Sequence, residues 1–407
     1  MKAATTCYRL LACVLVFLVV GALPGCWDRK EIESLGFITM VGLDFDGERG
    51  SVVLTVHVAK PFAIGKEQAG AAAQEKPFWV TTVEAETVAL AARKLSFVSP
   101  RTPSWGHCRL IVVGEDLARR GILDVIDWFD RNSVVGRRPN LLIVKGGTAR
   151  DLLQGEFALE RMPVQGYAGL LESVSRLLSQ FGASSIIEFL RTLDQEGMDP
   201  VLPAFELVRV RDDMETPGEL RRDEVKATAR LTGIALFKKD KLVGWLDEEE
   251  TRTYHWVRGF VDMDYMKVPD PERPGKVISL QLVRSRGQFQ PEIRQGNIFV
   301  HVKVSVQAKL AEVDREFDPL TTPREWSEVE QALAKEVGNE VICLVSKAES
   351  LNADVFGFGA ALYRKSPKDW TRVRDRWDEL FPEITAEVEV DATLLGPGVS
   401  LRTIRPK

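Results

Sequence analysis

The chain has 407 residues, of which 45% are apolar and 28% are charged, and its formal net charge is −5. This is an ordinary globular composition, and the length gives a rough prior of two or three domains with a sizeable core. The acidic balance argues against a nucleic-acid-binding protein and against a polybasic membrane-binding patch.

The first 25 residues have the layout of a lipoprotein leader. Lys2 and Arg9 precede an apolar stretch of about 14 residues, shorter than the roughly 20 that a helix needs to cross a bilayer. Leu23-Pro24-Gly25-Cys26 then has the form of a lipobox, with proline as an unusual residue at its second position. We expect residues 1–25 to be removed and Cys26 to carry a diacylglyceryl group, because two acyl chains hold a soluble domain on a membrane stably. An ordinary signal peptide followed by an incidental cysteine is the alternative.

The remaining cysteines do not suggest a disulfide framework. Cys7 and Cys13 lie in the predicted leader, and Cys26 is assigned to the lipid, so only Cys108 and Cys343 are left. Each of these two stands beside an apolar run, and both are predicted to be small core residues. A disulfide between them stays open as an alternative in an extracytoplasmic protein.

Residues 26–211 are expected to form an N-terminal α+β region of one or two lobes. Short apolar or alternating runs bounded by turn residues predict strands, and apolar residues at steps of three and four predict helices. Asp46-Gly47 predicts a hairpin between the first two strands, and the strand–helix–strand order over 110–144 predicts a βαβ unit. The expected strands are 37–45, 52–59, 80–84, 110–114 and 141–144, and the expected helices are 87–97, 115–129, 165–181 and 184–193.

Residues 212–224 are charged and contain Pro217-Gly218, which is typical of a linker, and residues 225–407 are expected to form a C-terminal domain. Thr322-Pro323-Arg324-Glu325 has the form of a capping box and opens a periodic apolar pattern of about 28 residues, which predicts one long helix. We therefore expect an α+β fold with mixed sheets and helices in two or three lobes, the C-terminal lobe being an antiparallel sheet with one long helix. The expected C-terminal strands are 228–238, 242–246, 277–286, 298–310 and 384–394, with a shorter helix over 368–380.

The sequence has few signs of catalysis or metal binding. Gly357-Phe358-Gly359 lacks the third glycine of a dinucleotide-binding loop, and a tight turn or close helix contact is the better interpretation. Residues 44–48 contain three acidic side chains but are too short for an EF-hand loop. We expect a protein that is not an enzyme and that folds without metal or cofactor. The four histidines are isolated from one another and lack the spacing of a zinc pair: His57, His107, His255 and His301.

Two groups of aromatic residues are candidates for a binding surface. Trp245 and Trp256 flank an acidic turn at 247–250, and Trp370 lies with other aromatics on one predicted helix face. Core packing is the ordinary role of such spaced aromatics. A partner interface is the sharper hypothesis, because tryptophan is enriched at interaction hot spots, and its candidate anchors are Trp245, Trp256 and Trp370.

Three separated stretches of the chain resemble one known family. Cys26-Trp27-Asp28-Arg29-Lys30 follows the leader, Thr232-Gly233-Ile234-Ala235-Leu236-Phe237 is followed by a glycine–tryptophan pair, and Asp354-Val355-Phe356-Gly357-Phe358-Gly359 lies near the C-terminus. In this order they resemble the C-subunit lipoproteins of spore germinant receptors, the Ger(x)C family.

The resemblance implies a lipid-anchored, non-enzymatic receptor subunit. It would act with a polytopic A subunit and a transporter-like B subunit on the outer surface of the spore inner membrane, in a complex that senses nutrients such as amino acids or sugars. The alternative is a lipid-anchored solute-binding protein of an importer, which usually has two similar lobes of repeated βαβ units around a cleft. The long antiparallel strands expected in the C-terminal half argue against that alternative. A cell-wall hydrolase is a third possibility, without an acid pair or metal motif to support it.

Overall fold

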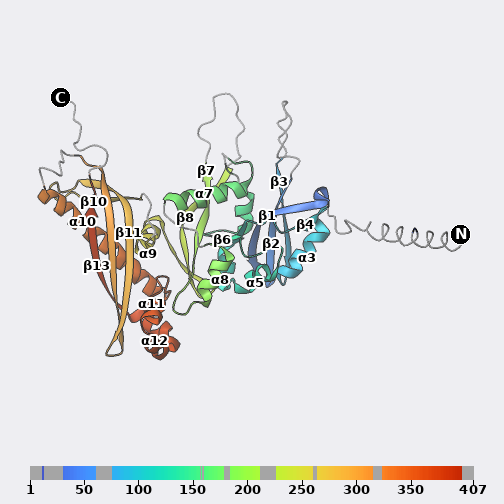
Figure 1. Cartoon of the computed structure of the whole chain (residues 1–407). Helices are drawn as coiled ribbons and strands as arrows, with labels where there is room; N and C mark the ends of the chain where they lie inside the picture. Colours follow the sequence, from blue (N-terminus) through green and yellow to red (C-terminus); the bar gives the residue numbers. More distant parts are fainter. Residues whose placement is uncertain are drawn as a thin grey trace, which may run out of the picture.

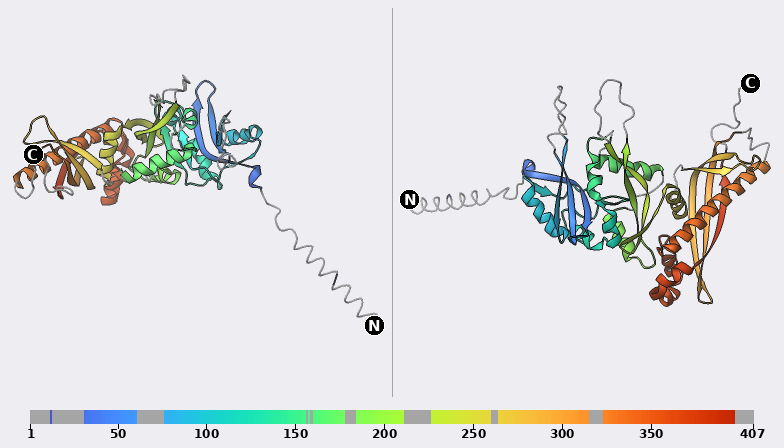
Figure 2. Two further views of the ribbon diagram at one scale, coloured as in Figure 1. Left: turned by 90° about the horizontal axis from the view of Figure 1, so that it is seen from above. Right: turned by 180° about the vertical axis from the view of Figure 1, so that it is seen from behind.

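The computed structural model describes residues 12, 31–60, 76–155, 157, 160–177, 184–210, 226–259, 264–314 and 323–396. Over these residues the molecule is elongated, with the first strands at one end and a second sheet at the other (Figures 1 and 2). Cys26 and, apart from residue 12, the whole predicted leader lie outside the described residues. Among the helices that are described, none combines the length and apolar character needed to cross a bilayer.

The larger sheet is mixed, with eight strands in the order β3-β2-β1-β5-β6-β7-β8-β9 and β4 paired to the start of β1. The central strands β1, β5, β6 and β7 run parallel, and the outer ones pair antiparallel. The bounds are β1 (Leu35–Asp46), β2 (Ser51–Ala59), β3 (Phe78–Ala85), β4 (Thr102–Ser104), β5 (Leu110–Val113), β6 (Asn140–Val144), β7 (Val201–Val210), β8 (Lys226–Lys238) and β9 (Lys241–Leu246).

Helices cover both faces of this sheet because its central strands are apolar on both sides. On β5, Ile111 and Val113 face one core while Leu110 and Val112 face the other, as the two-residue period of a strand requires. Helices α3, α4, α5 and α8 bury side chains in the first core, and α6 and α7 in the second. These helices are α3 (Val88–Val98), α4 (Glu115–Arg120), α5 (Leu123–Arg131), α6 (Ala149–Gln154), α7 (Pro163–Leu177) and α8 (Ile186–Asp194).

The smaller sheet has the order β10-β11-β12-β13, and the long helix α10 crosses one of its faces (Figure 1). Alternate residues of β12 from Ile298 to Ala308 are buried on that face, against a stripe on α10 that includes Leu333, Val337 and Val341. The bounds are α9 (Glu248–Arg258), β10 (Asp264–Pro269), β11 (Val277–Arg294), β12 (Asn297–Glu312), α10 (Pro323–Ser350), α11 (Phe358–Lys365), α12 (Pro367–Val373), α13 (Trp377–Leu380) and β13 (Thr385–Leu394).

The predicted α+β class, with mixed sheets and a long C-terminal helix, is confirmed, as is the hairpin at Asp46-Gly47. One part of the prediction was wrong: the C-terminal sheet is not wholly antiparallel. The closing strand β13 pairs parallel with β12, because the chain crosses through α10 to α13 before it returns.

Two predicted helices are each divided in the structure. The helix expected over 115–129 ends at Gly121, whose φ of 125° lies outside the helical region, and it restarts at Leu123. The helix expected over 368–380 consists of α12, a 3₁₀ turn at Arg374–Arg376, and α13. The predicted apolar residues are nevertheless buried in both cases, since the turns preserve which side faces the core.

The predicted linker, 212–224, lies outside the described residues, and the two strands that flank it pair with each other. β7 and β8 are antiparallel neighbours from Val201↔Leu236 to Val210↔Lys226. The segment therefore connects two strands of one sheet, so the large sheet contains strands from both predicted domains, 26–211 and 225–407. A charged segment with a Pro-Gly pair suits a long strand connection as well as it suits an interdomain linker.

Candidate functional site: the joint between the two sheets and the arginine pocket beside it

The segment that follows α10 returns to the large sheet and forms a joint with it. Asp354, which is 1% exposed, accepts hydrogen bonds from the backbone N–H groups of Gly357, Phe358 and Gly359, each at 2.8 Å. Its carboxylate thereby satisfies donors at the start of α11, which would otherwise lack partners. Trp377 Nε1 donates to the same carboxylate at 3.2 Å. One buried acid therefore fixes the entry to α11 and the position of α13.

Asp199, just before β7, holds the other side of the joint. Its backbone N–H donates to Asp354 O, and Asp354 N donates to Asp199 Oδ2, both at 2.9 Å. Asp199 also accepts from the Lys239 N–H at 2.8 Å and from Lys238 Nζ at 3.3 Å. Lys238 Nζ lies 2.6 Å from an Asp378 carboxylate oxygen on the C-terminal side. These bonds tie the turn between β8 and β9 and the approach to β7 to the segment before α11.

Glycines allow the two backbones to touch at this joint. The Ala360 N–H donates to Gly197 O at 2.9 Å, and Gly197 has a φ of +70°. A Cβ on Gly359 would lie 2.8 Å from Gly197 Cα and 2.8 Å from the Trp370 ring. The Gly357-Phe358-Gly359 stretch therefore serves a close helix contact, which was the preferred interpretation of this sequence.

The electrostatics of the joint are those of a buried acid. Burial raises the pKa of Asp354 to about 7, while the three backbone N–H donors act in the opposite direction and the nearby Asp199 carboxylate adds to the increase.

Two of the three candidate interface tryptophans belong to the core. Trp256 is 1% exposed, and its Nε1 donates to Asp264 Oδ2 at 3.1 Å. Trp370 is 3% exposed, donates to the Glu196 carboxylate, and packs edge-on against the Trp377 ring at 5.1 Å. Because both indoles are buried and expose almost no surface to a partner, core packing is the better interpretation of Trp256 and Trp370. The third, Trp245, is half-buried, with Lys145 Nζ 5.8 Å from its ring centroid, and it stays a candidate.

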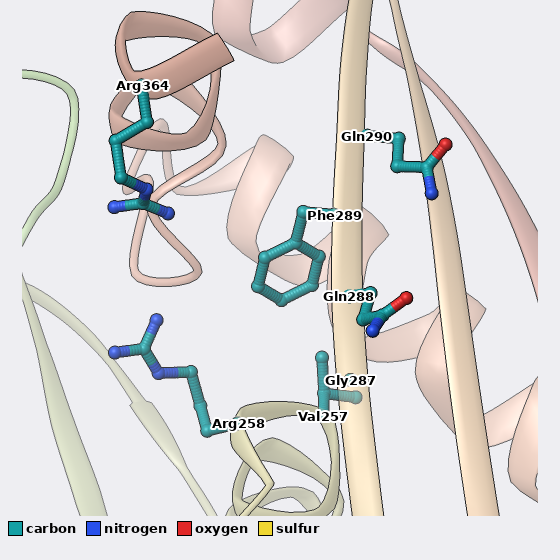
Figure 3. Close-up of a pocket in the computed structure, with 7 residues that line it drawn as sticks. All are labelled: Val257, Arg258, Gly287, Gln288, Phe289, Gln290 and Arg364. Atoms are coloured by element: carbon teal, nitrogen blue, oxygen red, sulfur yellow. The ribbon is translucent and has the colours of Figure 1, made fainter.

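An arginine pocket of about 530 Å³ lies directly beside the joint (Figure 3). Arg258 at the end of α9 and Arg364 on α11 point toward the same space, with the Phe289 ring between them, while the side chains of Gln288 and Gln290 point away. Neither guanidinium pairs with an acidic side chain among the described residues. The lining residues are Val257, Arg258, Gly287, Gln288, Phe289, Gln290 and Arg364.

The 354–359 motif also supports this arginine pocket. Arg258 Nη1 donates to the Phe356 carbonyl at 2.9 Å, and this hydrogen bond fixes the position of the guanidinium group. The Phe289 ring packs edge-on against the Phe358 ring at 5.0 Å. Because Asp354 orders Gly357 to Gly359, the buried acid of the joint also helps to position the wall of the pocket.

Direct contact of α9 with β11 closes the back of the pocket. A Cβ on Gly287 would lie 1.8 Å from Val257 O, so no side chain fits at this position without moving the helix. Ser285 Oγ donates to Trp256 O at 2.7 Å and satisfies a carbonyl at the helix end. Local sequence contains few signals for this site, because Asp199, Gly287 and Arg364 belong to no pattern that indicates a pocket.

The remaining candidates do not form a second site. Among the described residues there is no group of three histidine, cysteine or acidic side chains placed to hold a metal ion. Cys108 is buried and free, and burial raises the pKa of its thiol to about 12. Cys343 is also free, but it is exposed on α10, so its predicted core position was wrong. It occupies an outward position on a helix whose neighbouring apolar residues, Val341 and Leu344, face the core.

Comparison with known proteins identifies the class to which this two-sheet architecture belongs. Residues 28–207 match the family described as "Spore germination protein N-terminal domain", and residues 232–398 match "Spore germination B3/ GerAC like, C-terminal". The chain belongs to the Ger(x)C family of spore germination proteins, as its sequence motifs predicted.

Individual relatives are similar along nearly their whole length. The chain is 27% identical to "Spore germination protein KC" of Bacillus subtilis (strain 168) over 406 residues, which cover 98% of each chain. It is 21% identical to "Spore germination protein GerQC" of Bacillus cereus, covering 95% of this chain and 99% of the relative. The crystal structure of the GerBC protein has the same fold, with a TM-score of 0.50 and 17% identity, covering 87% of this chain and 96% of that one.

Proposed function

We propose that this chain is the lipid-anchored, non-enzymatic C subunit of a spore nutrient germinant receptor. The observation that carries the proposal is the match of both halves of the chain, in order, to spore germination families. Its partners would be the membrane, through a diacylglyceryl group on Cys26, and the A and B subunits of the same receptor. Its location would be the outer surface of the spore inner membrane.

The character of the described residues supports a binding role rather than turnover. Two buried networks, around Asp354 and around Trp256, hold elements together, and their polar groups are used by internal hydrogen bonds. The predicted lipid and the short segment before Leu35 would keep the large sheet close to the bilayer and raise its effective concentration toward membrane partners. Trp245, the half-buried candidate, is the proposed contact residue. The two sheets differ in strand order and size, which does not favour the importer alternative.

The test uses spores of the organism that carries this chain. Deletion should abolish the response to particular nutrients and leave nutrient-independent germination intact, and the wild-type gene should restore the response. Cys26→Ala should leave the protein unprocessed or released from membranes, whereas Cys343→Ala, which removes the exposed thiol of α10, should behave like wild type. Deletion spores that respond normally, with no second C subunit present, would refute the assignment. A mature N-terminus at another, unmodified residue would refute the lipid anchor.

A further inference from the structure

The arginine pocket has the features of a ligand-binding site. These features do not depend on the proposed receptor role. Two guanidinium groups from different helices converge on one space, although like charges repel and the chain as a whole carries an excess of acidic residues. Neither group finds an acidic partner within the described part of the chain. An arrangement of this kind favours an anion, because a guanidinium offers several N–H donors in a planar fork that matches carboxylate oxygens.

The arginines are positioned before any ligand arrives. Arg258 is half-buried and bonded to the Phe356 carbonyl, on a helix end that Ser285 and the contact at Gly287 hold against β11. Arg364 is exposed and lies on α11, whose start Asp354 fixes. Preorganised donors reduce the entropy lost on binding.

The wall between the two arginines is apolar. Phe289 is half-buried, points into the arginine pocket, and is backed by the Phe358 ring. The volume of about 530 Å³ is in the range of pockets that hold small organic molecules. An inorganic anion would use the charges and leave the aromatic wall without a partner.

We propose that the arginine pocket binds a small organic carboxylate with an apolar body. The carboxylate oxygens accept hydrogen bonds from Arg258 and Arg364, and the apolar body lies against Phe289. The pocket opens to solvent, and its volume of about 530 Å³ suits a free small molecule.

Sodium benzoate is the probe, and benzamide is its neutral counterpart of nearly the same shape. Binding to the purified full chain in detergent is measured by titration calorimetry, with acetate and inorganic phosphate as further ligands. Benzoate should bind saturably, and benzamide, acetate and phosphate should each bind at least about tenfold more weakly. Because guanidinium groups stay charged, benzoate binding should be lost on acidification only near the carboxyl pKa of about 4.

Arg364→Gln is the main variant, since this side chain is exposed and has no described partner whose loss would disturb the fold. It should weaken benzoate binding about tenfold without changing the unfolding temperature. Arg93→Gln makes the same charge change on an exposed arginine of α3 and should leave binding unchanged. Phe289→Leu should weaken benzoate more than acetate. Absence of benzoate binding, equal binding of benzamide or phosphate, or full binding by Arg364→Gln would each overturn the proposal.

Discussion

Single glycines decide how closely elements approach in this protein, and Gly287 is the sharpest case. Replacing it with alanine should force α9 away from β11, because the new methyl group would meet the Val257 carbonyl rather than a movable side chain. We expect the free energy of unfolding to fall by about 2–4 kcal/mol, measured by denaturant titration.

Gly338→Ala is the matched control for this change. Gly338 lies in the middle of α10, and its Cβ would make an ordinary 3.6 Å contact with Val390. Alanine there should stabilise the protein by about 0.5–1 kcal/mol through helix propensity. Equal effects of the two substitutions would show that the contact at Gly287 is not the cause.

A buried histidine should make the protein sensitive to acid. His57 is fully buried in β2, stacks on Phe78, and pairs its Nδ1 with Thr39 Oγ1 at 2.8 Å; burial lowers its pKa to about 4. Below about pH 6.5 the unfolded chain takes up a proton at this residue and the folded chain does not. The contribution of His57 to the free energy of unfolding should therefore be complete above about pH 6.5. It should decrease by up to about 3 kcal/mol as the pH falls to about 4.

His57→Asn isolates that contribution from all other titrating groups, including Asp354. Asparagine keeps a polar atom near Thr39 but has no proton to gain, so its unfolding free energy should fall less between about pH 7 and about pH 4.5 than that of the wild type. His107→Asn, at an exposed position before β5, should keep the wild-type slope. A His57→Asn slope equal to the wild-type slope would contradict the assigned role.

At the scale of elements, local sequence predicted most strands because their residues alternate or form short apolar runs. It predicted α10 almost to the residue, since a capping pattern precedes a long apolar stripe. It did not predict the break at Gly121, because an isolated glycine is tolerated within a helix and only the turn back toward Asp240 requires its φ of 125°. The direction of β13 was also beyond local patterns, since strand pairing depends on the route of the intervening helices.

The start of α9 gives a prediction for an element that sequence analysis interpreted as an acidic turn. Asp247 caps this helix by accepting from the Glu250 N–H at 2.9 Å, and the Glu250 carboxylate accepts from the Asp247 N–H at 2.9 Å. Asp247→Ala should cost about 1 kcal/mol of unfolding free energy. Glu249→Ala, at an exposed position in the first turn of the same helix, should cost distinctly less, and thermal unfolding of both variants is the measurement.

At the scale of the whole molecule, the joint should determine whether the two sheets unfold together. Asp199→Ala would remove a buried carboxylate that accepts hydrogen bonds from the backbone N–H groups of Asp354 and Lys239, and both donors would lose their acceptor. We expect a loss of about 2–4 kcal/mol and faster cleavage by protease near the joint. Asp375→Ala, an exposed acid near the same helices, is the control and should unfold like wild type. An unchanged protease pattern in Asp199→Ala would contradict the importance of the joint.

The joint itself could not be predicted from sequence. Asp199 and Asp354 are 155 positions apart, and neither lies in a periodic pattern that indicates its partner. The 354–359 motif carries part of the family resemblance, but its physical role depends on three N–H groups that meet one carboxylate only in the folded chain. The pairing of Arg258 with Arg364 could not be predicted either, because the chain forms most of the smaller sheet between the two helices that carry them. Burial of Trp256 and Trp370 likewise follows from long-range packing.

The joint has a mechanical consequence. The chain passes once from the larger sheet to the smaller one, after β9, and then returns through residues 353–360 to bond with 197–199. Attachment at a second point removes the free swivel that a single covalent connection would allow, and the apolar core that β8 and β9 share with the smaller sheet restrains bending as well. A pull or a ligand-induced shift at the smaller sheet should therefore reach β1 to β3, at the other end of the molecule, with little of the displacement lost to rotation between the two sheets.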